Sequence, residues 1–222
     1  MPAFNEEKGI TQTIKDFAQP YVDEIIVVDN NSSDNTAKLA RKAHRRVKLV
    51  EEKKQGYGHS LQRGMKEAKG DIIILTESDA TFSGKDMEKL LSYIGDTDMV
   101  LGTRVTEELL DKEAKMDWFL FYGNLFIAKL IQLRFWHKTR LTDVGCTFRA
   151  IRKDAYLRIV KEFTVGGSHF SPEMIIVALK KGLKTVEIPV HYKERVGNSK
   201  ITSNRWKSFK LGLKMIQLIL TR

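Results

Sequence analysis

Two carboxylates, Glu77 and Asp79, stand one residue apart directly after the mostly apolar run 72–76 in the stretch DIIILTESDATF. Side chains alternate along a strand, so these two point the same way if the strand geometry persists. Adjacent carboxylates repel unless a cation lies between them, and such oxygen ligands suit Mg²⁺ or Mn²⁺, with diphosphate oxygens completing the shell. The pattern indicates a metal site that carries a phosphate, although an acidic pair at a strand end can also simply begin a loop.

The charge of the chain is uneven. Its 222 residues carry a formal charge of +10, and no acidic residue follows Glu194. Such an end favours an anionic partner, namely a phosphate, a nucleic acid or an acidic membrane surface, and the alternative is a solvated basic face. The single cysteine, Cys146, excludes an internal disulfide and fits a reducing compartment, so we expect a cytoplasmic protein.

The elements that position the carboxylates alternate between strands and helices up to about Arg104. This alternation predicts an α/β fold with a mostly parallel sheet, in which ligands bind outside the carboxyl ends of the strands. A later strand, 183–192, contains Pro189 and is therefore expected at a sheet edge. In the first half, strands are expected within 24–29, 45–52, 71–79 and 98–104, and helices within 34–44 and 57–70.

The beginning of the chain departs from this alternation. It opens with MPAFNEEKGITQTIKDFA, a loop that leads into a helix, where an α/β layer should begin with a strand. We therefore expect the sequence to start late, with the first strand missing from the centre of the sheet. That strand would deliver Asn5 and Glu6 to the edge that also receives Asp29, Asn30 and the pair of carboxylates.

Two helices in the second half combine apolar and basic residues. The first, 117–136, is nearly long enough to span a bilayer, but Lys129 and Arg134 interrupt it, which favours an amphipathic or buried helix. The second, 206–220, sets an apolar stripe beside a lysine stripe, as in a helix that lies in a membrane interface. The sequence thus predicts a peripheral protein on the cytoplasmic face of a membrane, with ordinary packing of the last helix as the alternative.

Several stretches, in sequence order, resemble a known family. PAFNEE, IIVVDNNSSDNT, KKQGYGHSLQRGMKEAKGDIIILTESDATF and GTR resemble the nucleotide-sugar half of the family 2 glycosyltransferases with the GT-A fold, a Rossmann-like sheet flanked by helices. LTDVGCTFRAIRKDA and VEIPVHYKERVGNSK resemble the acceptor half of one branch, the polyprenyl-phosphate sugar synthases such as dolichol-phosphate mannosyltransferase. The resemblance implies one GT-A domain over 1–222, with its nucleotide-sugar half at 1–104 and its acceptor half at 105–222.

The resemblance also implies roles for single residues. Glu77 and Asp79 match the metal motif of the family, with a glutamate in place of the first aspartate, and Thr147 stands where a glycine is usual. The residues implied to bind the nucleotide-sugar are Pro2, Ala3, Phe4, Asn5, Glu6, Asp29, Asn30, Gly58 and Ser78. Those implied to be catalytic are Asp79, Asp143 and Arg149, and those implied to bind the acceptor phosphate are Arg104, Arg195, Ser199 and Lys200.

The implied reaction is a metal-dependent, inverting transfer of a hexose from a nucleotide-sugar, of the GDP-mannose or UDP-glucose type, to a polyprenyl or dolichyl phosphate. A hydroxyl acceptor, as in a cell-wall or surface glycan, would need a general base, for which Asp143 is the candidate. A nucleotidyltransferase would need a glycine-rich basic loop where this chain has PAFNEE. A nucleic-acid-binding module would leave Glu77 and Asp79 without a role, so no nucleic acid partner is expected.

Overall fold

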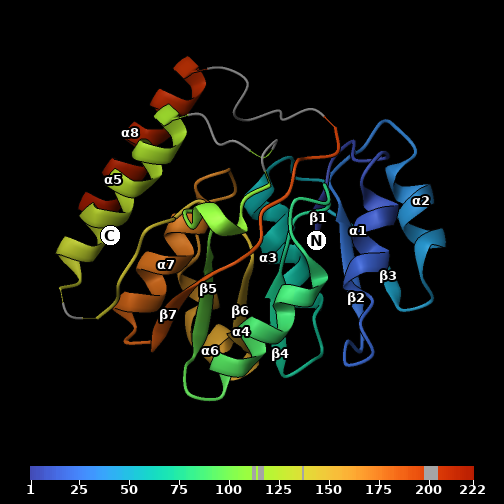
Figure 1. Ribbon diagram of the computed structural model, residues 1–222, viewed down its shortest axis with the longest axis horizontal. Coiled ribbons are helices and arrows are strands. Elements are labelled where there is room, and N and C mark those ends of the chain that lie inside the picture. Colours follow the sequence, from blue (N-terminus) through green and yellow to red (C-terminus); the bar gives the residue numbers. More distant parts are fainter. Residues whose placement is uncertain (112–113, 115–117, 137, 198–204) are drawn as a thin grey trace.

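A computed structural model of the chain describes residues 1–111, 114, 118–136, 138–197 and 205–222 (Figure 1). The strands are β1 Pro2–Ala3, β2 Ile25–Asp29, β3 Val47–Glu51, β4 Ile72–Leu75, β5 Met99–Thr103, β6 Arg149–Arg152 and β7 Thr185–Pro189. The helices are α1 Ile10–Phe17, α2 Thr36–Ala43, α3 Tyr57–Glu67, α4 Met87–Ile94, α5 Trp118–Arg134, α6 Lys153–Ile159, α7 Phe170–Lys180 and α8 Arg205–Thr221. Strands and helices alternate as predicted, and the α/β fold class is confirmed.

The strands form two hydrogen-bonded sheets that meet near the N-terminus. One has the order β1–β2–β3 with all pairs parallel, and the other has the order β4–β6–β5–β7. In the second sheet β6 runs antiparallel to both neighbours, whereas β5 and β7 are parallel. The Ser78 hydroxyl, just past β4, donates a 2.7 Å hydrogen bond to the carbonyl oxygen of Pro2 in β1. β7 lies at a sheet edge, as Pro189 predicts.

A short first strand is present. β1 pairs with β2 so that Pro2 lies beside Val28 and Ala3 beside Asp29. The expectation that no strand precedes the first helix is therefore wrong. Two residues are too few to show the alternation by which a strand is identified in a sequence.

The second sheet mixes the two halves of the chain, because β6 and β7 pair with β4 and β5. α7 packs in the core, and its residues from Phe170 to Leu179 are all buried, which explains why most of this helix is apolar. This shared core holds the ends of β4, β5 and β7 in fixed positions relative to one another. The division into nucleotide-sugar and acceptor halves stays a prediction.

Helices α5 and α8 lie side by side at one end of the molecule, away from β1–β3 (Figure 1). Both helices contribute to the main hydrophobic core, through Ile127 and Ile131 of α5 and Met215 and Ile219 of α8. Within the ranges that the structure describes, no helix has both the length and the apolar character needed to cross a membrane. Their exposed large apolar side chains are Trp118, Tyr122, Phe126 and Leu133 on α5, and Trp206, Phe209, Leu213 and Leu220 on α8.

Candidate active site

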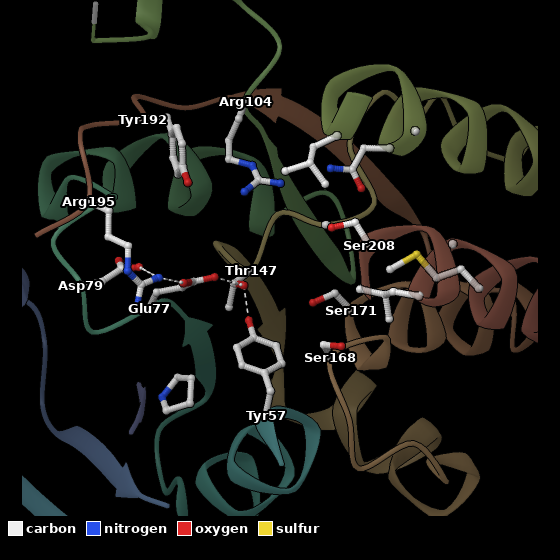
Figure 2. Close-up of a pocket in the computed structure, with 18 of the residues that line it drawn as sticks. Tyr57, Glu77, Asp79, Arg104, Thr147, Ser168, Ser171, Tyr192, Arg195 and Ser208 are labelled. Carbon is white, nitrogen blue, oxygen red and sulfur yellow. Dashed lines mark hydrogen bonds and ion pairs between the residues drawn. The ribbon is translucent and has the colours of Figure 1, made fainter. Parts of the chain in front are cut away.

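The carboxyl ends of five strands open onto one cavity of about 950 Å³. Its wall includes a residue that follows each of β1, β2, β4, β5 and β7, and Figure 2 shows the labelled side chains pointing into it. Parallel strands bring their carboxyl ends to one edge, so this convergence is the one expected for an α/β sheet. These five residues are Phe4, Asn30, Glu77, Arg104 and Tyr192.

Glu77 and Asp79 both line this cavity, as their spacing predicts. Asp79 is buried, and its Oδ1 accepts hydrogen bonds from the Thr81 backbone N–H at 3.2 Å and the Thr81 hydroxyl at 2.6 Å. Oε1 of Glu77 accepts a hydrogen bond of 2.8 Å from the Thr147 hydroxyl. Burial of Glu77 and the charge of the neighbouring Asp79 raise the pKa of Glu77 to about 8, so a cation is needed to keep Glu77 ionised at neutral pH.

A guanidinium lies between these carboxylates. Nη1 of Arg195 is 2.6 Å from Asp79 Oδ2 and 3.9 Å from Glu77 Oε2, and Nη2 pairs with Oε1 of Glu6. Arg195 therefore occupies the position that the sequence predicts for a cation. The acceptor-phosphate role predicted for Arg195 requires that its guanidinium exchange these carboxylates for a phosphate.

The pair of carboxylates also fits a divalent cation. Oδ2 of Asp79 is buried and, apart from its ionic contact with Arg195, accepts no hydrogen bond from the described residues. Two carboxylates leave most of the coordination shell of Mg²⁺ or Mn²⁺ to phosphate oxygens and water. Across the part of the chain that the structure describes, no group of three or more His, Cys, Asp or Glu side chains could hold a metal. A cation bound by Glu77 and Asp79 would therefore take its further ligands from diphosphate oxygens and water.

Asp143 is paired inside the protein. Nε and Nη2 of Arg104 donate hydrogen bonds of 2.7 and 3.0 Å to the two oxygens of Asp143, which also accepts the Gly145 backbone N–H at 3.0 Å. Burial by itself would raise the pKa of Asp143, but the charge and hydrogen bonds of Arg104 outweigh this effect and hold the pKa below its usual range. Arg104 lines the cavity and Asp143 does not. The expected role of Asp143 as a general base is not supported, and its position is that of a residue that orients Arg104.

Arg149 does not line the cavity either. Its side chain is buried, and its guanidinium donates to the carbonyl oxygens of Ser171, at 3.0 Å, and Cys146. These bonds hold the start of α7 against β6, so the predicted contact of Arg149 with a reacting phosphate is not supported by its position. Ser199 and Lys200, predicted for the acceptor phosphate, lie outside the described residues.

Most residues implied to bind the nucleotide-sugar are at the cavity. Those that line it are Pro2, Ala3, Phe4, Glu6, Asn30 and Ser78. The Asn30 side chain fixes the next loop as well, because its amide group donates to the carbonyl oxygens of Glu52 and Lys54 and accepts from the Gly56 backbone N–H.

Three other residues of this set lie outside the cavity lining. Asn5 Oδ1 accepts the Ser33 backbone N–H at 2.7 Å, which ties the loop after β1 to the loop after β2. Gly58 is a packing residue, because a Cβ at this position would lie 2.6 Å from the Val165 carbonyl oxygen. Asp29 is buried at the end of β2. Asn5, Gly58 and Asp29 do not line the cavity.

Sequence reasoning missed two parts of the cavity. One is a group of hydroxyls that includes Tyr57, Thr147, Ser168 and Ser171, which Figure 2 shows around the same space as Glu77. The unusual Thr147 in the family motif was the only signal for it. The other part is an apolar arm of the cavity between α5 and α8. The sequence predicted that both helices carry apolar side chains, but not that these side chains line a cavity. The arm is lined by Phe119, Leu120, Phe126 and Ile127 of α5 and by Phe209, Leu213, Met215 and Ile216 of α8.

Comparison with known proteins places this site in a family. The model described as Glycosyl transferase family 2 matches residues 1–160, well over half of the chain. The chain belongs to glycosyl transferase family 2. The predicted family, the GT-A fold and the enzyme class of a glycosyltransferase are thereby confirmed.

Individual relatives agree with this family. Over 207 residues the chain is 28% identical to the dolichyl-phosphate hexose transferase of Haloferax volcanii, and the match covers 90% of this chain and 84% of the relative. Over 210 residues it is 29% identical to the low-salt glycan biosynthesis hexosyltransferase Agl6 of the same organism, with 91% of this chain covered. The chain spans about half, 49%, of the length of that second relative.

A solved structure shares the fold. It is glucosyl-3-phosphoglycerate synthase from Mycobacterium tuberculosis in complex with Mn²⁺, uridine diphosphate and glucosyl-3-phosphoglycerate. The TM-score is 0.73 at 16% sequence identity, and the match covers 99% of this chain and 77% of the other. At this identity the likeness concerns the fold alone.

Proposed function

We propose that the chain transfers a hexose from a nucleoside-diphosphate sugar, of the GDP-mannose or UDP-glucose type, to a polyprenyl phosphate, with inversion at the sugar carbon. The observation that carries this proposal is the shape of the cavity, which joins the Glu77–Asp79 pair to the apolar arm between α5 and α8. A polar sugar-nucleotide suits the first region and a lipid chain suits the second. The name of the dolichyl-phosphate hexose transferase supports the same class of acceptor.

The chain's own residues suit this chemistry. Glu77 and Asp79 would hold Mg²⁺ or Mn²⁺ together with diphosphate oxygens, and a cation in that position neutralises charge on the leaving diphosphate. Arg195 has to give up its contact with Asp79 when the cation enters. Its guanidinium then becomes available, beside the cavity, to bind the acceptor phosphate.

The pairing of Asp143 favours a phosphate over a hydroxyl acceptor. An acceptor phosphate is an anion at neutral pH and attacks without a strong general base, whereas a hydroxyl needs one. The candidate base is bound to Arg104 through both carboxylate oxygens and does not line the cavity. Arg104 itself faces the cavity and adds a positive charge that suits a phosphate.

The function is tested by comparing two acceptors. The protein is incubated with Mn²⁺, a radiolabelled GDP- or UDP-hexose, and either a polyprenyl phosphate or the polyprenol of the same length. We expect transfer to the phosphate and at least tenfold less to the alcohol, because one charge-assisted contact contributes about 1.5–3 kcal/mol and each 1.4 kcal/mol is about tenfold. Equal use of the alcohol contradicts the proposed acceptor, and the absence of transfer from every donor contradicts the proposed reaction.

The variant Arg195→Gln distinguishes an effect on the acceptor from an effect on the cation and the donor. We expect it to lower transfer to the phosphate, while Mn²⁺ binds at least as tightly as in the parent because the competing guanidinium is gone. Arg158→Gln is the matched control, since this arginine lies on α6, is exposed and pairs only loosely with Asp98 at 3.8 Å. Unchanged transfer by Arg195→Gln would exclude a phosphate-binding role for this residue.

We further propose that the exposed faces of α5 and α8 lie on an anionic membrane surface. Trp118 is 65% exposed and Trp206 is 63% exposed on these neighbouring helices, beside Lys210 and Lys214 of α8. Aromatic side chains and lysines together suit the membrane interface, where each lysine contributes about 1 kcal/mol near anionic lipid. We therefore expect the protein to float with phosphatidylglycerol vesicles at low salt.

A double variant, Trp118→Ser with Trp206→Ser, tests which face binds. We expect at least a tenfold loss of vesicle binding, because burying one large apolar side chain contributes about 1.5–3 kcal/mol. The control is Tyr93→Ser with Leu157→Ser, which removes exposed apolar side chains from α4 and α6. A parent that stays at the bottom of the gradient, or equal losses in both double variants, would rule out this surface.

A further inference from the structure

A chain of hydroxyl groups ends at the first carboxylate of the candidate metal site. Tyr57, the first residue of α3, contacts Thr147 through its hydroxyl, and Thr147 lies just before β6. The Thr147 hydroxyl in turn lies 2.8 Å from Oε1 of Glu77. Figure 2 shows the three side chains along the wall of the cavity, where Thr147 contacts Tyr57, 90 positions away in the sequence, and Glu77, 70 positions away.

The hydrogen atoms of this chain can be assigned by counting. When a bound cation keeps Glu77 ionised, its carboxylate only accepts hydrogen bonds, so the single hydroxyl hydrogen of Thr147 points toward Oε1. The Tyr57 hydroxyl must then donate to Thr147. Burial of Tyr57 and the charge of Glu77 raise the pKa of Tyr57, which keeps its phenol protonated and able to donate. With the cation bound, both hydrogen bonds therefore run in one direction, from Tyr57 through Thr147 to Glu77.

Glu77 needs such support more than an aspartate would. A glutamate has one more rotatable bond between backbone and carboxylate, and ordering it costs more conformational entropy. Thr147 fixes Oε1, and the other oxygen, Oε2, faces the Arg195 guanidinium at 3.9 Å. One oxygen is thus anchored in the wall, and the other is directed to the position of the cation.

We propose that Thr147, oriented by Tyr57, is a positioning residue that holds Glu77 for a divalent cation bound with a nucleoside diphosphate. The inference rests on the proposed function, because it assumes that Glu77 and Asp79 hold such a cation. Thr147 is buried, and the hydroxyl contacts found for it among the described residues are those with Tyr57 and Glu77. The alternative is that both hydroxyls only satisfy each other and join α3 to β6, without effect on the cation.

The experiment measures the affinity for Mn²⁺ by calorimetry in the presence of UDP or GDP. Residues that orient metal ligands contribute about 10–100-fold to metal affinity, and we expect a loss in this range for Thr147→Val, which keeps the shape and removes the hydroxyl. Thr147→Ser should stay within about threefold of the parent, because it retains the hydrogen bond. Tyr57→Phe should give a smaller loss in the same direction, and it provides a second test if Thr147→Val does not fold.

Two further variants separate positioning from stability. Thr139→Val removes another buried threonine hydroxyl, one that accepts a hydrogen bond from Thr185, and should leave the Mn²⁺ affinity unchanged. In a Glu77→Ala background, Thr147→Val should cause no additional loss, because the carboxylate that it positions is absent.

Two results overturn the inference while the proposed function stands. They are a parent-like Mn²⁺ affinity in Thr147→Val, and the same loss with or without Glu77. If the parent itself binds neither nucleotide in a Mn²⁺-dependent way, the proposed metal site fails and this inference fails with it. The parent thus reports on the function and the variants report on the positioning role.

Discussion

Replacing Asp79 by asparagine is expected to weaken Mn²⁺-dependent binding of the nucleoside diphosphate by at least about 100-fold. Even residues that only orient a metal ligand contribute about 10–100-fold to metal affinity, so loss of a ligand's charge should reach the upper end of this range or exceed it. The asparagine can still accept the hydrogen bonds that Thr81 donates to Oδ1. Arg195 keeps its pairing with Glu6, so the loop after β7 retains an anchor.

Calorimetric titration of UDP and GDP, with and without Mn²⁺, measures this effect. Asp96→Asn is the matched control, because it makes the same change in charge at an exposed position after α4. Thermal unfolding of both variants shows whether the fold persists. An Asp79→Asn protein that binds the nucleotide with the parent's affinity and the parent's metal dependence would disprove the assignment of the metal site.

Replacing Asp143 by alanine is expected to lower the free energy of unfolding by about 3–5 kcal/mol. Removing one partner of a buried ion pair leaves the other charge uncompensated, and Arg104 is only 11% exposed. The backbone N–H of Gly145 loses its acceptor as well. For a domain of this size each kcal/mol corresponds to roughly 2–4 °C, so the melting temperature should fall by roughly 6–20 °C.

Urea unfolding provides the measurement, and Asp154→Ala provides the control. Asp154 pairs with Arg152 at 2.6 Å, but its side chain is 62% exposed, so solvent screens the pair and we expect a much smaller loss. The double variant Arg104→Met with Asp143→Leu should recover part of the loss, because neither charge then remains buried. Similar losses for Asp143→Ala and Asp154→Ala would contradict the structural role of the Arg104–Asp143 pair.

Acid should weaken the parent more than this double variant. The pKa of Asp143 is lower in the folded chain than its ordinary value. The stability that this carboxylate contributes is therefore fully present above its pKa in the unfolded chain, about 4. It is lost as the pH falls from that value through the lower pKa of the folded chain. The difference in unfolding free energy between parent and double variant should shrink as the pH is lowered through this range.

The sequence by itself determined the fold class and the position of the carboxylates. A run of apolar residues forms a strand, and the residues that follow it lie at the carboxyl edge of the sheet, so Glu77, Asp79 and Asn30 could be assigned to one site from their order alone. These predictions use only periodicity and chain direction, which are local properties. The same reasoning failed for β1, because two residues carry no periodicity.

Only the tertiary structure decided which charges meet. Arg195 lies 116 positions from Asp79 in the sequence and yet takes the place of the cation, while Asp143 is bound by Arg104 and Arg149 is enclosed behind α7. The antiparallel β6 and the apolar arm between α5 and α8 likewise result from pairing and packing over long distances. Local spacing sets the direction of a side chain, but its partner and its burial depend on which elements pack together. The partner and the burial in turn determine whether a charged group binds a ligand or supports the fold.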